Sequence, residues 1–141
     1  MASIFKVIPT VDQLNKLSQH TMVSHLGIEF LRCTEDSIVA RMPVDERTHQ
    51  PMGLLHGGAS VALAETLGSV CGSCCVESGK QTVVGLEINA NHIKSARSGW
   101  VTGISKPIHV GKRTQVWEIR ISNDKEELVC ISRITLAVID L

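Results

Sequence analysis

The sequence lacks tyrosine and has only two phenylalanines and two tryptophans, so aromatic residues make up 3% of its 141 residues. Proteins that hold single-stranded nucleic acid stack its bases on aromatic side chains, and this scarcity argues against that class. Net charge is also lacking, because 14 basic residues balance 14 acidic ones. A basic excess would be expected of a protein that binds nucleic acid or a membrane surface, so neither partner is predicted.

Long apolar runs are missing as well. No run approaches the roughly 20 apolar residues of a membrane span. The first nine residues include a lysine and no apolar stretch, so no secretory signal is expected. The cysteines number five, an odd count, and three of them lie between residues 71 and 75. This is a poor disulfide framework and fits a reducing compartment, so we expect a cytoplasmic protein.

The length predicts a single domain over residues 1–141. Its first element is a short helix from Thr10 to about His20, because Thr10 and Gln13 form a capping-box pair. Two short strands are predicted at residues 27–32 and 37–43, followed by a loop from 44 to 56.

The most distinctive segment runs from residue 57 to residue 78. It contains no lysine or arginine and only two acidic residues, Glu65 and Glu77. Apolar and small residues occur all the way round it, which predicts a helix over residues 58–76 that is buried on most sides.

The remainder predicts four strands with apolar residues at every second position, over residues 82–91, 99–107, 113–122 and 127–140. Val84, Leu86, Ile88 and Ala90 are expected on one face of the first of these strands. The predicted fold class is therefore α+β, an antiparallel sheet of five to six strands wrapped round one long helix. Apolar residues on both faces of the last strand indicate an oligomer.

Glu65 is the strongest candidate for chemistry. It lies in the middle of the apolar helix, with no basic residue within one turn to pair with it. A buried carboxylate without a partner is costly unless it is kept for function, and a desolvated carboxylate is a better general base. The alternative is a carboxylate at the helix edge that is solvated or bonded across a subunit contact.

His56, Gly57 and Gly58 lead into the same helix. The first N–H groups of a helix have no partner within it and favour an oxyanion, and the glycines would let a carbonyl approach. The alternative is a turn that His56 merely caps. Gln50, in the preceding loop, is a weaker candidate.

The spacing of His56 and Glu65 predicts a shared site. Nine residues along a helix correspond to ~13 Å of rise and about half a turn of phase difference. Within one chain these side chains can hardly reach the same substrate atom. Either one of them is irrelevant, or two protomers build each site together, as a symmetric dimer allows.

Three clustered cysteines and two basic stretches are further candidates for binding sites. Cys71, Cys74 and Cys75 share a helix face but lack a second ligand pair at zinc spacing, so no metal site is predicted. Two short basic stretches, residues 94–97 and 109–114, each include a pair of cations that could meet phosphates, although solvated loop charges are the alternative.

The sequence resembles the hotdog-fold acyl-CoA thioesterases from about Met22 to the C-terminus. The resemblance rests on Gln50 to Ser60, Ala64-Glu65, Gly68-Ser69, Val84 to His92 and Gln115-Val116-Trp117. It is closest to the branch that contains the 1,4-dihydroxy-2-naphthoyl-CoA thioesterases of menaquinone biosynthesis and the proofreading thioesterases of the enterobactin pathway. Val70 after Ser69 is more similar to the naphthoyl side of this branch.

This resemblance implies edge-to-edge dimers that pair into a homotetramer. It implies that Glu65 is the nucleophile or general base, acting with Gln50 and His56 of another subunit, while the Gly57 N–H holds the thioester oxygen and Ser69 supports the water or the acid. It assigns no cofactor. Gly85 would line the thioester channel, and the CoA end would bind His92, Ile93, Lys94, Ser95, Arg97, His109, Val110, Gly111, Lys112, Arg113 and Thr114.

The function expected from these residues is hydrolysis of an aromatic or β-hydroxyacyl thioester of CoA to the free acid and CoA. Three alternatives stay open: a non-catalytic acyl-thioester-binding protein, a proofreading hydrolase of misacylated acyl carrier protein, and a hydratase of the same fold.

Overall fold

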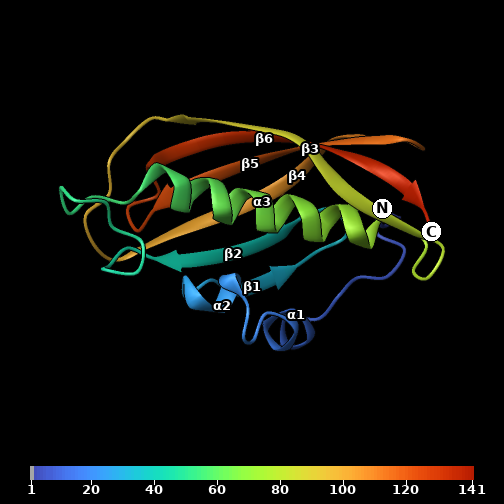
Figure 1. Ribbon diagram of the computed structural model, residues 1–141, viewed down its shortest axis with the longest axis horizontal. Helices are drawn as coiled ribbons and strands as arrows, with labels where there is room; N and C mark the ends of the chain where they lie inside the picture. Colours follow the sequence, from blue (N-terminus) through green and yellow to red (C-terminus); the bar gives the residue numbers. More distant parts are fainter. Residues whose placement is uncertain (1) are drawn as a thin grey trace.

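The computed structural model describes residues 2–141, which form three helices and six strands. Along the chain these are α1 (Val11–Leu17), α2 (Met22–His25), β1 (Glu29–Cys33), β2 (Ile38–Pro43), α3 (Gly57–Cys74), β3 (Gln81–His92), β4 (Trp100–Val110), β5 (Thr114–Asn123) and β6 (Leu128–Asp140). All neighbouring strands are antiparallel, in the order β1-β2-β4-β5-β6-β3. The predicted α+β architecture is confirmed (Figure 1).

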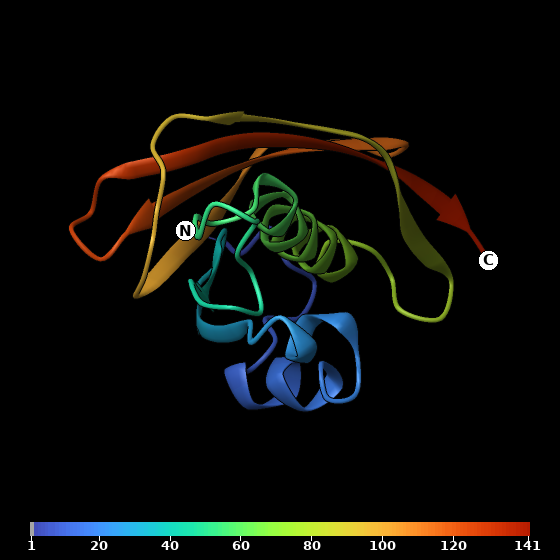
Figure 2. The same ribbon diagram turned by 60° about the vertical axis from the view of Figure 1, so that its left-hand side comes forward.

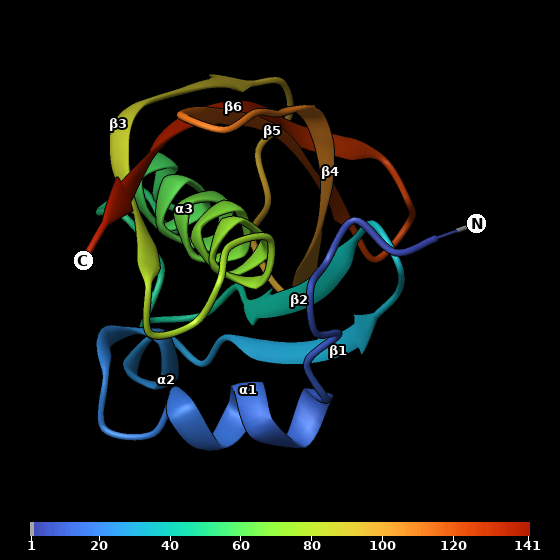
Figure 3. The same cartoon turned by 90° about the vertical axis from the view of Figure 1, so that its right-hand side faces the viewer.

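The sheet curves around α3, which lies against its concave face (Figures 2 and 3). The core between them is formed by completely buried side chains of the inner faces of β5 and β6, including Trp117, Ile119, Ile121, Ile134 and Leu136. The period of two predicted for residues 113–122 is therefore confirmed. The two short N-terminal helices lie on the far side of β1 from the rest of the sheet (Figure 3).

Small residues let α3 approach the sheet closely. A Cβ on Gly68 would lie 2.5 Å from Ile134, and a Cβ on Gly72 would lie 2.4 Å from Leu136. Both glycines are therefore required by helix–sheet packing. They face the core and not the exposed side of α3 that carries Glu65.

Only one side of α3 is buried. Its buried residues are Ala59, Ser60, Leu63, Ala64, Leu67, Gly68, Cys71 and Gly72. The opposite side, with Val61, Ala62, Glu65, Ser69 and Ser73, is partly or fully exposed. The prediction of burial on most sides was thus wrong for a single chain, whose sheet reaches only one face of the helix.

A β-bulge corrects the predicted faces of β3. Its register with β6 shifts between Gly85 and Glu87, so that Leu86 has no partner. An extra residue in a strand moves the following side chains to the opposite face. Val84 and Leu86 are accordingly 42% and 62% exposed, whereas Ile88 packs against the core.

The N-terminal region contains one more helix than predicted. The capping box of Thr10 and Gln13 is present, but α1 ends at Leu17, three residues before the predicted boundary. Thr21 then caps the single turn of α2, which is too short to show a helical period in the sequence. Ahead of α1, the Phe5 ring stacks on Trp117 with their centroids 6.2 Å apart, and this contact anchors the segment to the core.

The other boundaries agree with the predictions within a few residues. β4 continues past Pro107, where the sequence predicted its end, because a bulge between Pro107 and His109 accommodates the missing N–H. No helix among residues 2–141 is long and apolar enough to cross a membrane.

Candidate active site

The first turn of α3 presents a backbone donor. His56 is the N-cap, and its Nδ1 accepts a hydrogen bond of 2.8 Å from the Gly58 N–H. The Gly57 N–H makes no hydrogen bond to any of the described residues. An unpaired N–H at the positive end of an 18-residue helix can stabilise a developing oxyanion.

A pocket of about 330 Å³ opens in front of this helix end. Its lining includes six of the predicted site residues, namely Gln50, Gly57, His92, Ile93, Lys94 and Ser95. The side-chain oxygen of Gln50 accepts a hydrogen bond from the Met52 N–H, so the amide nitrogen is left for another partner. The pocket therefore gathers hydrogen-bond donors and is suited to an electron-rich group such as a carbonyl oxygen.

Gly57 has a second reason to be glycine. A Cβ at this position would lie 2.9 Å from Nε2 of His92. The imidazole thus occupies the space that a side chain of residue 57 would need. His92 comes from the end of β3, which places a ring from the sheet beside the first residue of the helix.

Glu65 lies in a different pocket. It is exposed, which corrects the expectation that the chain buries it, and its carboxylate has no hydrogen-bond or ion-pair partner among residues 2–141. The pocket measures about 390 Å³, and α2 supplies Met22 and Val23 to its wall. Apart from Glu65, its side chains are apolar except for Thr66, whose hydroxyl donates to the Ala62 carbonyl at 2.7 Å.

Two predicted neighbours of Glu65 are near it. A Cβ on Gly85 would lie 3.7 Å from Oε1 of Glu65, so β3 passes the carboxylate without a side chain. Ser69 is one helical turn further along the same face of α3 and lines an apolar groove of about 670 Å³ between α1 and α3. Within one chain, Gln50 and Gly57 do not line the Glu65 pocket.

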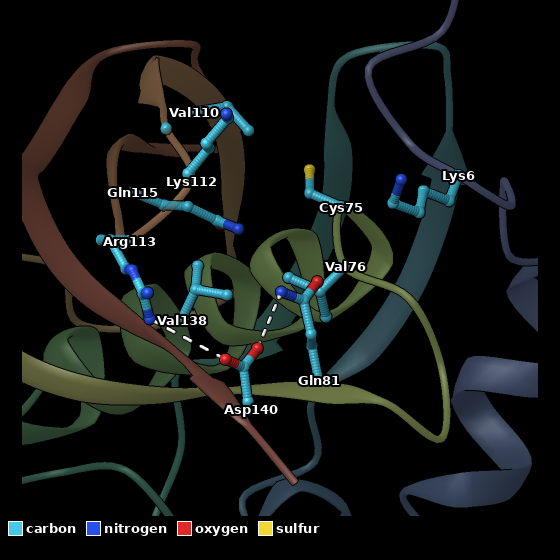
Figure 4. Close-up of a pocket in the computed structure, with 11 residues that line it drawn as sticks. Lys6, Cys75, Val76, Gln81, Val110, Lys112, Arg113, Gln115, Val138 and Asp140 are labelled. Atoms are coloured by element: carbon cyan, nitrogen blue, oxygen red, sulfur yellow. Dashed lines mark hydrogen bonds and ion pairs between the residues drawn. The ribbon is translucent and has the colours of Figure 1, made fainter.

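The second basic stretch lines a third pocket, of about 540 Å³, at the C-terminal end of α3 (Figure 4). It includes Val110, Gly111, Lys112 and Arg113. Arg113 lies 3.8 Å from Asp140, while Lys112 has no ion pair in the described part of the chain. His109 and Thr114 flank this pocket in sequence but do not line it.

Lys6 adds a cation that sequence analysis missed. The Lys6 N–H donates to the Cys74 carbonyl at 2.8 Å, and this bond holds the N-terminal segment beside the pocket. Because Lys6 is about 100 residues from Lys112 in sequence, only the tertiary fold brings them together. The one sequence feature that pointed to an anchored segment was Phe5, an aromatic residue in a chain with few of them.

The two basic stretches lie at opposite ends of the folded chain. His92, at the end of β3, pairs with Cys130 of β6, whereas Thr114, at the start of β5, pairs with Ala137 of the same strand β6. Cys130 and Ala137 are seven residues apart along β6, which corresponds to roughly 23 Å at ~3.3 Å per residue. Near His92, Lys94 forms an ion pair with Glu127 that lowers the pKa of this carboxyl, while Arg97 has no ion pair within residues 2–141.

Burial makes the thiols of Cys71, Cys74 and Cys75 weakly nucleophilic. Burial raises the pKa of Cys71 to about 12 and that of Cys74 and Cys75 to about 11. They are therefore neutral thiols near neutral pH, whereas metals and electrophiles need the thiolate. No group of three metal-ligating side chains was found in the part of the chain that the structure describes.

Comparisons with known proteins agree with this fold. The family model described as "Thioesterase superfamily" matches residues 52–130. The chain is 54% identical over 136 residues to the 1,4-dihydroxy-2-naphthoyl-CoA hydrolase of Escherichia coli, covering 96% of this chain and 99% of the relative. It is 50% identical over 135 residues to the proofreading thioesterase EntH of Cronobacter turicensis, covering 96% and 98%.

A solved structure is similar over the same extent. The crystal structure of the thioesterase HI1161 from Haemophilus influenzae superposes with a TM-score of 0.94 at 54% identity, covering 98% of this chain and 96% of the other.

Proposed function

The chain belongs to the thioesterase superfamily, and from this premise we propose that it hydrolyses an aromatic acyl thioester of CoA, similar to 1,4-dihydroxy-2-naphthoyl-CoA, to the free acid and CoA. It is a thioester hydrolase with a hotdog fold, so the non-catalytic and hydratase alternatives are set aside. The observation that supports the substrate best is the Glu65 pocket, in which one unpaired carboxylate faces otherwise apolar walls. An aromatic acyl group would fill such a pocket without leaving buried polar groups unpaired.

In this proposal the Gly57 N–H holds the thioester oxygen, and Glu65 attacks the carbonyl carbon or takes a proton from the attacking water. Charge that develops on the oxygen is stabilised by the N-terminus of α3. His56 donates from Nε2 and Gln50 donates from its amide nitrogen toward the same thioester. Ser69, on the Glu65 face of α3, holds the water or the acid product. Menaquinone biosynthesis would be the pathway that this substrate serves.

The active site is proposed to lie between two subunits. Glu65 lines one pocket of the chain, and Gln50 and Gly57 line another. The exposed face of α3 leaves room for a second copy of the chain, which would bring the two pockets together. The edge strand β3 carries exposed Val84 and Leu86 and is free to pair with the β3 of another subunit. Such dimers, paired into a homotetramer, would bring Glu65 of one subunit to Gly57 of the next.

A second candidate is hydrolysis of thioesters held on an acyl carrier protein, as in proofreading. It is favoured by the 50% identity to EntH over nearly the full length. Both candidates predict release of a free thiol, so they differ only in the carrier.

The experiment that tests the proposal measures thiol release from a panel of naphthoyl, benzoyl and β-hydroxyacyl thioesters, each presented on CoA and on carrier protein. The expected result is a kcat/KM for aromatic acyl-CoA at least ten-fold above that of the other substrates, because only the aromatic group fills the apolar pocket. A preference for β-hydroxyacyl groups, or for the carrier protein, would contradict the proposed substrate.

Salt should weaken the binding of the CoA end. Lys112 and Arg113 are exposed cations beside a pocket of about 540 Å³, and exposed ion pairs are screened over ~8 Å at physiological salt. We expect KM for acyl-CoA to rise with ionic strength at nearly constant kcat, because contacts far from the reacting carbon bind ground and transition states alike. Lys112→Ala should raise KM several-fold and flatten the salt dependence.

An acyl-pantetheine substrate, which lacks the nucleotide, is the control and should respond to neither change. Arg97→Ala should have the same effect as Lys112→Ala if the two basic stretches serve one CoA from different subunits. A KM that is insensitive to salt and to all of these substitutions would mean that the nucleotide binds elsewhere.

A further inference from the structure

His56 uses one of its two ring nitrogens to cap α3. A neutral imidazole has one N–H donor and one acceptor nitrogen, and the acceptor Nδ1 of His56 is occupied by the Gly58 N–H at 2.8 Å. Its own proton is therefore on Nε2. A second proton on Nδ1 would face the Gly58 N–H and break the N-cap of α3, so His56 can donate a hydrogen bond but is a poor general acid.

His92 is the other imidazole at this helix end. Neither of its ring nitrogens makes a hydrogen bond to any residue from 2 to 141, although the ring lies against Gly57 and lines the same pocket as Gln50. It therefore keeps both a lone pair and an N–H available, as a group that gives and regains a proton requires.

Ser60 is an unexplained polar group in the same pocket. It is only 1% exposed, and it lines the pocket together with Gly57 and His92. Ser60 lies three residues after Gly57, on the same face of α3, and helical side chains lean toward the N-terminus. Ser60 is thus one turn from Gly57 in the same pocket as the His92 ring.

The position of the thioester follows from the proposed function, on which this inference rests. With the carbonyl oxygen at the Gly57 N–H, the sulfur is one bond from the carbonyl carbon. The CoA arm leaves the pocket past Lys94 and Ser95, which follow His92 in sequence and line the same pocket. The sulfur is therefore closest to His92.

We propose that His92 is a further catalytic residue, which protonates the CoA sulfur as the C–S bond breaks, and that Ser60 is a positioning residue for its ring. Water supplies the hydroxyl group of the acid, and its displaced proton goes to Glu65. The His92 ring takes a proton from solvent on its free nitrogen and gives a proton to the departing sulfur. Glu65 releases its proton to solvent, so that one water is consumed in each turnover.

The test varies the leaving group. A thiolate of CoA benefits from protonation as it departs, whereas 4-nitrothiophenolate departs readily without it. His92→Gln should lower kcat/KM for benzoyl-CoA by about 10²-fold, the lower end of the usual loss of acid–base catalysis. For the 4-nitrothiophenyl ester of benzoic acid, the loss should be less than about three-fold. Ser60→Ala should show the same pattern as His92→Gln, with a smaller loss for benzoyl-CoA.

Two variants serve as controls. His20→Asn removes an imidazole remote from the pocket, at a φ of 61° that asparagine tolerates, and should leave both rates unchanged. Glu65→Gln should lose activity equally on both esters, because attack precedes departure of either leaving group. Equal losses on the two esters in His92→Gln, or no loss at all, would overturn the role of His92. Retained activity in Glu65→Gln would instead overturn the proposed function.

Discussion

Glu65→Gln should lower kcat for acyl-CoA hydrolysis by about 10²–10⁴-fold, the loss typical when an acid–base group is removed. Glutamine keeps the shape of the side chain but can neither attack a carbonyl nor accept a proton from water. The carboxylate is exposed and unpaired in the described chain, so its replacement should change the free energy of unfolding by less than about 0.5 kcal/mol. Steady-state thiol release, with thermal unfolding measured on the same sample, would separate the two effects.

Glu77→Gln is the matched control. Glu77 is the other acidic residue of the segment from 57 to 78, and it forms an exposed ion pair of 2.9 Å with Lys80. Exposed pairs contribute little to stability, and Glu77 itself lines none of the described pockets. This variant should hydrolyse acyl-CoA at the wild-type rate. Normal turnover by a well-folded Glu65→Gln protein would exclude Glu65 as nucleophile or base.

The elements of the fold could be predicted because their patterns are local. The capping box at Thr10, the period of two in β5 and the uninterrupted apolar stretch of α3 are each determined by neighbouring residues. The bulge at Leu86 was not predictable in this way, because an extra residue in a strand leaves the composition unchanged and shows only against the partner β6.

The site was predicted in its parts but not in its arrangement. Gln50 and Gly57 were recognised and do line one pocket, since a helix N-terminus and its preceding loop are adjacent in sequence. The exposure of Glu65 and the location of Lys6 depend on which surfaces the sheet and the N-terminal segment cover. Those are long-range contacts, which periodicity and spacing do not encode.

His56 and Glu65 are nine residues apart on α3, with half a turn of phase between them. This spacing predicted that one chain could not join them, and Glu65 does line a pocket that includes neither His56 nor Gly57. If two subunits build each site, each subunit gives Glu65 to one site and His56 to the other. Mixing two variants tests this arrangement, because the activity of a mixed dimer depends on how many of its two sites are complete.

Two inactive variants should therefore restore activity when they are mixed. His56→Asn removes the imidazole while keeping a side chain that caps helices well, and Glu65→Gln removes the carboxylate. In a mixed dimer one site combines the intact His56 of one subunit with the intact Glu65 of the other, and the second site lacks both. Random exchange at equal concentrations makes half of the dimers mixed, so about one quarter of the wild-type activity should return.

The reciprocal mixture checks that subunits exchange. When wild-type protein is mixed with the double variant His56→Asn/Glu65→Gln, both sites of every mixed dimer lack one group. Activity should then fall from one half of the wild-type value to about one quarter as exchange proceeds. If each chain held a complete site of its own, this mixture would stay at one half and the two single variants would remain inactive together. That pair of results, from samples in which native electrophoresis shows exchange of differently tagged subunits, would contradict the shared site.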